Sequence, residues 1–235
     1  MFNKYSLYAR LYPMIILFLP FIVIGIAFSI EYKNLLQILT TLGVTTALSY
    51  LFSNLGRDMG KRKENKLWDK WGGMPTVQLM NYNNSIIDII TKQRYHSKMM
   101  ELLPVDRTIN FVDANKKLLE DIYLSWTKYL ITHTRDIKKY PLLFNENISY
   151  GFRRNLWGLK AISIILISLS IVFNYLFQAI NHGFDKFIAF PIEFYISQTI
   201  LFILLFFWIF VIKPNWIKIP AFAYAERLFE AIDSL

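Results

Sequence analysis

Residues 11–30 read LYPMIILFLPFIVIGIAFSI, and residues 35–55 read LLQILTTLGVTTALSYLFSNL. Neither run contains a charged residue, and only the four residues 31–34 separate them. A helix needs about 20 consecutive apolar residues to cross the hydrocarbon core of a bilayer. The first run has no small-residue cleavage site, and a second run follows it at once, so a cleaved signal peptide is not expected. The two runs predict a transmembrane hairpin.

Two further apolar runs, at residues 159–176 and 189–212, predict a second hairpin. No charged residue lies between Lys160 and Asp185, or between Glu193 and Lys213. The whole chain of 235 residues is 54% hydrophobic, which is more than a soluble domain of this size usually carries. We therefore expect an all-α integral membrane protein with four transmembrane helices.

Basic residues are concentrated between the two predicted hairpins. The middle segment and the two tails hold nearly all of the 26 Lys and Arg residues, whereas the short loops on the opposite side contain only Lys33 and Lys186. Loops rich in Lys and Arg stay in the cytoplasm. We therefore expect the middle segment and both termini to be cytoplasmic.

The middle segment predicts a small helical domain at residues 56–158, between hairpins at residues 1–55 and 159–212. The second span is expected to continue as a helix through residues 61–71. Further helices are expected at residues 85–103 and 113–135, the second of them with Asp113 as its N-cap.

Two segments close this part of the layout. Pro141 is expected to end the preceding helical stretch, and Asn145 or Asn147 is expected to cap a helix that runs into the third span. The tail at residues 213–235 predicts an amphipathic helix after Pro220 that packs on the domain or on a neighbouring subunit.

Two basic clusters lie where the domain meets the predicted spans: Arg57, Lys61 and Arg62 after the second span, and Arg153 and Arg154 before the third. They could anchor the protein to anionic lipid headgroups, or they could bind an anionic ligand such as a nucleotide. The lipid interpretation is favoured, because the orientation rule places basic residues at these positions in any case.

The stretch from Gly56 to Lys61 superficially resembles a phosphate-binding loop. The spacing of its glycines is one residue short, and no Ser or Thr follows the Lys. A transmembrane helix also precedes it, where a phosphate-binding loop follows a strand. A phosphate-binding loop is therefore not expected here.

The second span carries a polar residue at every fourth position: Gln37, Thr41, Thr45, Ser49 and Ser53. This spacing keeps neighbours on one face of a helix. Such a face could pack against another helix or line the pore of an oligomer, and packing is favoured because Ser and Thr are common between membrane helices.

The stretch Trp71-Gly72-Gly73-Met74-Pro75 predicts a turn between helices. Two adjacent glycines permit a positive φ or a close backbone approach, which a binding site can use. The simpler interpretation, a helix stop beneath an aromatic side chain, is favoured.

Catalytic and metal-binding patterns are not expected. The chain contains no Cys, and its three His residues are far apart in the sequence. No triad spacing, carboxylate cluster or H-x-x-x-H pair is present. We therefore expect neither an enzyme of a familiar class nor a cofactor, and direct binding of nucleic acid is not expected.

Several motifs together resemble those of a group of uncharacterised bacterial four-helix membrane proteins. They are Gly56-Arg57-Asp58-x-Gly60-Lys61, Trp71-Gly72-Gly73-x-Pro75-Thr76, Thr134-Arg135-Asp136 and Glu146-Asn147-x-x-Tyr150-Gly151-Phe152-Arg153-Arg154-Asn155. The resemblance implies a bacterial inner-membrane location and no particular activity. The layout also resembles the four-transmembrane effectors of SMODS/CBASS-type anti-phage systems, which implies that a nucleotide second messenger or a phage signal triggers membrane permeabilisation.

These observations lead to one main functional hypothesis and two alternatives. The main hypothesis is a homo-oligomer whose cytosolic domain senses a ligand or protein partner and gates a pore or membrane lesion. The second is a membrane scaffold that recruits a cytosolic partner, and the third is a lipid-modifying enzyme.

Overall fold

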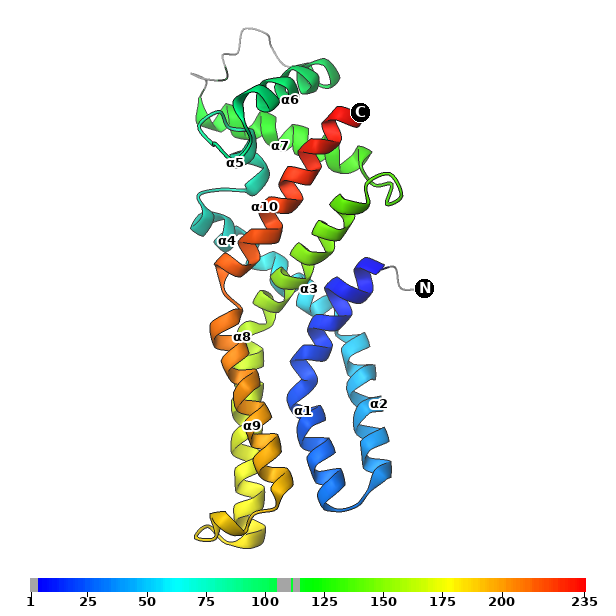
Figure 1. Ribbon diagram of the computed structural model, residues 1–235, viewed down its shortest axis with the longest axis vertical. Helices are drawn as coiled ribbons and strands as arrows, with labels where there is room; N and C mark the ends of the chain where they lie inside the picture. The colour runs from blue at the N-terminus through cyan, green and yellow to red at the C-terminus, as the bar shows by residue number, and fades with distance from the viewer. Residues whose placement is uncertain (1–3, 105–110, 112–114) are drawn as a thin grey trace. The chain divides into compact units, whose positions relative to one another are not determined.

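The computed structural model describes residues 4–104, 111 and 115–235, and each regular element in these ranges is a helix (Figure 1). The chain divides into two compact units. The first comprises Met1–Lys63 with Gly151–Trp216, and the second comprises Glu64–Tyr150 with Ile217–Leu235. The predicted all-helical fold is confirmed for the described residues.

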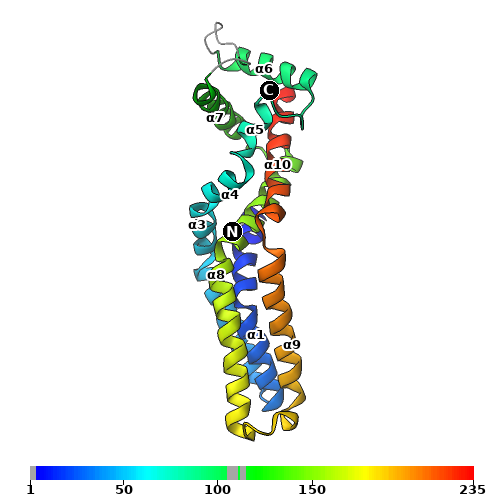
Figure 2. The same ribbon diagram turned by 90° about the vertical axis from the view of Figure 1, so that its left-hand side faces the viewer.

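The first unit is built mainly from four helical rods. A π-helical turn, Ser6–Leu11, leads into α1, Tyr12–Glu31, and a short loop connects α1 to α2, Leu35–Leu51. The other two rods are the C-terminal part of α8, Pro141–His182, and α9, Ile192–Phe206, which run side by side in Figures 1 and 2. The unit also contains α3, Ser53–Arg62, the 3-10 turn Phe187–Ala189 and the π-helical turn Phe207–Val211.

Three segments of the chain are long and apolar enough to cross a membrane: Ser6–Glu31, Pro141–His182 and Ile192–Val211. The helix α2 meets the same criterion only together with the helices that follow it across a bend at Phe52. Several membrane-spanning helices are thus supported, and the four-span arrangement stays a prediction.

Polar contacts join the helices of the first unit at both ends of α1. Near its beginning, the amide of Asn155 on α8 donates a hydrogen bond of 2.6 Å to the backbone carbonyl of Ala9. At its end, the amide of Gln178 on α8 donates one of 2.8 Å to the carboxylate of Glu31. Both amide side chains are fully buried, so these contacts fix the position of α1 along α8.

The second unit is a helical bundle around an aromatic core. Its helices are α4, Glu64–Trp71, α5, Pro75–Met80, α6, Ile89–Leu102, and α7, Lys116–His133, together with the beginning of α8 and most of α10, Pro214–Glu230. Tyr123 and Trp126 of α7 lie in the core with Met99 of α6. Leu228 and Phe229 of α10 belong to the same core, so the tail helix packs on the middle segment of the chain, although it begins at Pro214 and not after Pro220 as predicted.

Some predicted helix boundaries are wrong. The second span does not continue as one helix to residue 71, because α2 ends at Leu51 and α3 ends at Arg62. Pro141 does not end a helix but occupies the first position of α8, where its missing N–H has no partner to lose, so α8 begins before Asn145 and Asn147.

The two helices predicted in the middle segment are both shorter than expected. The helix expected at residues 85–103 begins after its N-cap Asp88, whose carboxylate accepts the Thr91 N–H at 2.9 Å. The next helix, α7, has Asn115 as its N-cap, and Asp113 lies outside the described residues.

Candidate functional site

The predicted basic clusters both lie in the first unit, on α3 and α8. Lys61 and Arg62 are exposed on α3. Arg153 is engaged within the unit, since its guanidinium donates a hydrogen bond of 2.8 Å to the Trp216 carbonyl and stacks 4.7 Å from the centre of the Trp216 ring. Arg154 is buried and donates to the amide oxygen of Asn155. The α8 arginines therefore contact groups of their own unit, whereas Lys61 and Arg62 are the exposed cations of α3, and lipid binding stays a prediction.

The Gly56–Lys61 stretch is a helix-packing motif. A Cβ atom on Gly60 would lie 3.0 Å from the backbone carbonyl oxygen of Arg154, and one on Gly56 would lie 3.1 Å from the side chain of Leu159. Two small residues four positions apart let helices approach closely. The glycines of this stretch thus bring α3 onto α8, which explains them without a phosphate.

The polar face of α2 is turned toward α1. Thr45 and Ser49 are buried, and their hydroxyls donate hydrogen bonds of 2.7 Å to the carbonyls of Thr41 and Thr45 on their own helix. Thr41 lies so close to Gly25 of α1 that a Cβ there would be 2.7 Å from its hydroxyl oxygen. This arrangement is helix packing within one chain, and the pore-lining role predicted for Gln37, Thr41, Thr45, Ser49 and Ser53 stays a prediction.

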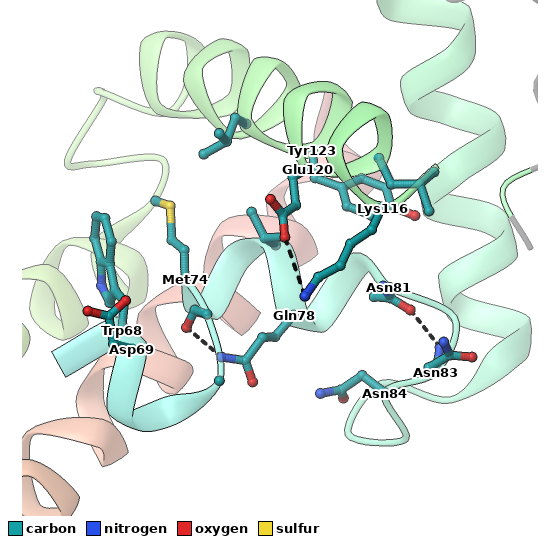
Figure 3. Close-up of a pocket in the computed structure, with 15 residues that line it drawn as sticks. Trp68, Asp69, Met74, Gln78, Asn81, Asn83, Asn84, Lys116, Glu120 and Tyr123 are labelled. Carbon is teal, nitrogen blue, oxygen red and sulfur yellow. Dashed lines mark hydrogen bonds and ion pairs between the residues drawn. The ribbon is translucent and has the colours of Figure 1, made fainter. Parts of the chain in front are cut away.

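The candidate site is a cavity of about 430 Å³ in the second unit (Figure 3). This volume lies in the range typical of small-molecule sites. Its lining comes from the end of α4, from α5 and the loops on either side of it, and from the first turns of α7. Figure 3 shows Trp68 and Asp69 on one side and Asn81, Asn83 and Asn84 on the other, with Lys116 and Glu120 of α7 between them.

The predicted glycine turn forms one wall of this cavity. Gly72 and Gly73 have φ values of 85° and 131°, which side chains with a Cβ rarely adopt, and they end α4. The amide nitrogen of Gln78 holds the turn by donating to the carbonyls of Trp71 and Gly73. The Trp71 ring is buried against Phe222. The stretch is therefore a helix stop, as predicted, and it also shapes a cavity.

The opposite rim is the loop of Asn81, Tyr82, Asn83 and Asn84, and a buried lysine holds it in place. The ammonium of Lys92 donates a hydrogen bond of 2.8 Å to the Asn81 carbonyl and another to the Asn84 carbonyl. Lys92 is 1% exposed, and this burial lowers its pKa, an effect that the charge of Asp88 opposes. The loop conformation thus depends on a cation that is bonded to two backbone oxygens.

A buried histidine lies among aromatic rings behind this rim. The ring of His96 lies 4.6 Å from Tyr82 and 5.1 Å from Trp126, centre to centre, and its Nε2 lies 2.9 Å from the Met80 carbonyl oxygen. Burial lowers the pKa of His96 to about 4; the Met80 bond opposes this shift and the charge of Lys92 adds to it. His96 is therefore neutral at physiological pH and belongs to the core.

The polar side chains of the described cavity lining are mainly carboxamides and charged groups. Glu120 and Lys116 form a loose ion pair, with 4.0 Å between the carboxylate oxygen and the ammonium nitrogen. Within residues 4–104, 111 and 115–235, no cluster of three His, Asp or Glu side chains is arranged to hold a metal ion. The carboxamides of Gln78, Asn81, Asn83 and Asn84 also line the cavity. The buried Tyr123 hydroxyl, another lining group, has no hydrogen-bond partner among the described residues.

Sequence reasoning found the glycine turn but missed the rest of this site. Gln78, Lys92 and the asparagine-rich stretch at residues 81–84 were not singled out. The local signal was the cluster of three Asn residues directly after a short helix, which is typical of a shaped loop. Comparison with family models, curated proteins and solved structures finds no match to this chain.

Proposed function

We propose that this protein is a multi-span bacterial inner-membrane protein that binds a small ligand in a cavity of its cytosolic helical unit. The single observation that carries the binding function is the cavity between α4, α5 and α7, whose carboxamides are held by backbone contacts. A rigid rim with polar groups still available to a ligand is what a recognition site requires.

The membrane part of the proposal has separate support. Three segments have the length and composition of spans, and α2 is the fourth in the proposed topology. The strongly basic middle segment favours the cytoplasmic side for the second unit. The exposed Lys61 and Arg62 would then lie near anionic headgroups, where each cation contributes about 1 kcal/mol to membrane binding.

A pore lined by the polar face of α2 is not part of this proposal. Thr45 and Ser49 are covered within the chain, and Thr41 contacts Gly25. Lining a pore with these residues would require α1 and α2 to separate and expose their contact surfaces.

The binding function is tested with the purified full chain in detergent and a library of soluble fragments, detected by saturation-transfer NMR. Leu124→Trp fills the cavity, and Ser125→Trp adds the same side chain at the next, exposed position of α7. We expect fragments that bind the native chain and Ser125→Trp but not Leu124→Trp. If no fragment shows this pattern, the cavity is not a binding site.

A further inference from the structure

We infer that the cavity binds an uncharged planar heterocycle with hydrogen-bonding groups along one edge, as nucleobases have, and that it does not bind phosphate. This inference rests on the proposed function and names the ligand class for the same site. It follows from the charges, the free hydrogen-bonding groups and the aromatic surface of the cavity lining.

The charges of the lining disfavour an anion. Within the described part of the chain, its charged groups are Asp69, Glu120 and Lys116, and Lys116 is already paired with Glu120. Among the residues that the structure describes, no Arg contributes to the lining, although Arg is the side chain best suited to bind phosphate. A phosphate group would therefore meet two carboxylates and one exposed, shared ammonium.

The beginning of α7 is also a poor anion site. A helix N-terminus attracts negative charge through its free N–H groups. Here the side chain of Asn115 accepts the Lys117 N–H at 2.9 Å, and the carboxylate of Glu120 lies in the adjacent turn. Both features reduce what the helix end could offer to a phosphate.

The orientation of three carboxamides of the cavity lining is fixed by hydrogen bonds within the described residues. The side-chain oxygens of Asn81 and Asn84 accept the N–H groups of Asn83 and Ile86, each at 2.9 Å. Their amide nitrogens are therefore the groups left to donate to a ligand. For Gln78 the reverse holds, because its nitrogen is used by the glycine turn and its oxygen is left to accept.

Two donors and one acceptor on fixed carboxamides match the edge of a heterocycle. Ring nitrogens and carbonyl oxygens accept from carboxamide donors, and an exocyclic amino group or ring N–H donates to the acceptor. The half-buried Trp68 provides an aromatic surface on the other side of the cavity (Figure 3), and stacking on such a surface is sequence-tolerant among nucleobases. Acyclic amides could use the carboxamides but would gain nothing from this ring.

The test measures binding by calorimetry with the full chain in detergent. The probes are adenosine, guanosine, cytidine and uridine, their 5′-monophosphates, and N-acetylglycinamide as an acyclic amide. We expect at least one nucleoside to bind about tenfold or more tightly than its own monophosphate and than the acyclic amide. The inference is overturned if a monophosphate binds as tightly as its nucleoside, or if only the acyclic amide binds.

Two substitutions locate the binding. Asn84→Asp keeps the oxygen that accepts the Ile86 N–H and replaces the free donor with an acceptor, and Asn65→Asp makes the same change at an exposed site on α4. Trp68→Leu keeps apolar volume and removes the aromatic face. We expect Asn84→Asp and Trp68→Leu each to weaken nucleoside binding about tenfold or more, and Asn65→Asp to leave it unchanged. Equal binding by all three variants would overturn the inference.

The two proposals fail in different ways. If fragments bind the cavity but no planar heterocycle is among them, the ligand class is wrong and the binding function stands. If every fragment that binds the native chain also binds Leu124→Trp, and no nucleoside binds, both the binding function and the ligand class are wrong.

Discussion

Gly158 of α8 lies directly against the backbone of Gly60 of α3. A Cβ atom added to Gly158 would be 2.8 Å from the Gly60 Cα and from the carbonyl carbon of Met59. Backbone atoms cannot move aside as a flexible side chain can, so this contact requires glycine on α8. It holds the basic end of α3 against α8 within the first unit.

The first prediction concerns this helix crossing. We expect Gly158→Ala to lower the free energy of unfolding by about 1–3 kcal/mol or more, the usual cost of overpacking. The measurement is thermal unfolding in detergent. Gly43→Ala on α2 is the matched control, because a Cβ there meets nothing within 4 Å, and it should be neutral or stabilising. Similar effects of the two substitutions would show that the crossing tolerates a methyl group.

The second prediction is a loss of stability in mild acid caused by His96. Its pKa is lowered to about 4 in the folded chain from the ordinary value of 6.5, so the unfolded chain binds the proton first as the pH falls. Above pH 6.5 His96 leaves the free energy of unfolding nearly unchanged. Between pH 6.5 and 4 its protonation in the unfolded chain lowers that free energy by up to about 3 kcal/mol. Below pH 4 the contribution stays constant.

The measurement for His96 is the denaturant midpoint as a function of pH. We expect His96→Met to flatten the curve between pH 6.5 and 4, whatever its effect on stability at neutral pH. His133→Gln, which changes an exposed histidine on α7, should leave the slope as in the native chain. If His96→Met leaves the pH dependence of the denaturant midpoint unchanged, the pKa of His96 is not lowered in the folded chain.

The third prediction concerns Lys92 and the asparagine loop. Lys92→Met keeps most of the buried side-chain volume but removes the ammonium that bonds the Asn81 and Asn84 carbonyls. We expect amide hydrogen exchange in residues 81–86 to become at least about tenfold faster, which corresponds to about 1.4 kcal/mol of local stability. Lys98→Met on the same helix should leave the exchange of this loop unchanged. Unchanged exchange in Lys92→Met would mean that the loop holds its conformation without the lysine.

The parts of the fold that the sequence predicts are those governed by short-range rules. Uninterrupted apolar runs identified the segments around α1, α8 and α9, because hydrocarbon tolerates few charged groups along about 20 residues. The stop at Gly72 and Gly73 followed from their freedom to adopt positive φ. The breaks at Phe52 and Lys63 were missed, because no Gly or Pro marks either position.

The candidate site was mostly beyond prediction, because its geometry depends on contacts between separate elements. The Asn81–Asn84 loop takes its conformation from Lys92 on the next helix, and Gln78 fixes the glycine turn from within α5. Neither contact has a local sequence signature. The sequence instead predicted the basic clusters as binding residues, because Arg binds phosphate groups well. In the structure, Arg153 and Arg154 contact groups of their own unit.

The last prediction concerns the side of the membrane on which the second unit lies. The chain contains no Cys, so a single introduced cysteine gives one unambiguous labelling site. Ser97→Cys places it on an exposed position of α6, and Lys186→Cys places it in the exposed loop between α8 and α9. A membrane-impermeant maleimide applied to intact spheroplasts should label Lys186→Cys at once and Ser97→Cys only after permeabilisation, because Lys-rich and Arg-rich segments stay in the cytoplasm. The native chain should remain unlabelled in both conditions. Labelling of Ser97→Cys from outside would reverse the proposed orientation and move the cavity away from any cytosolic ligand.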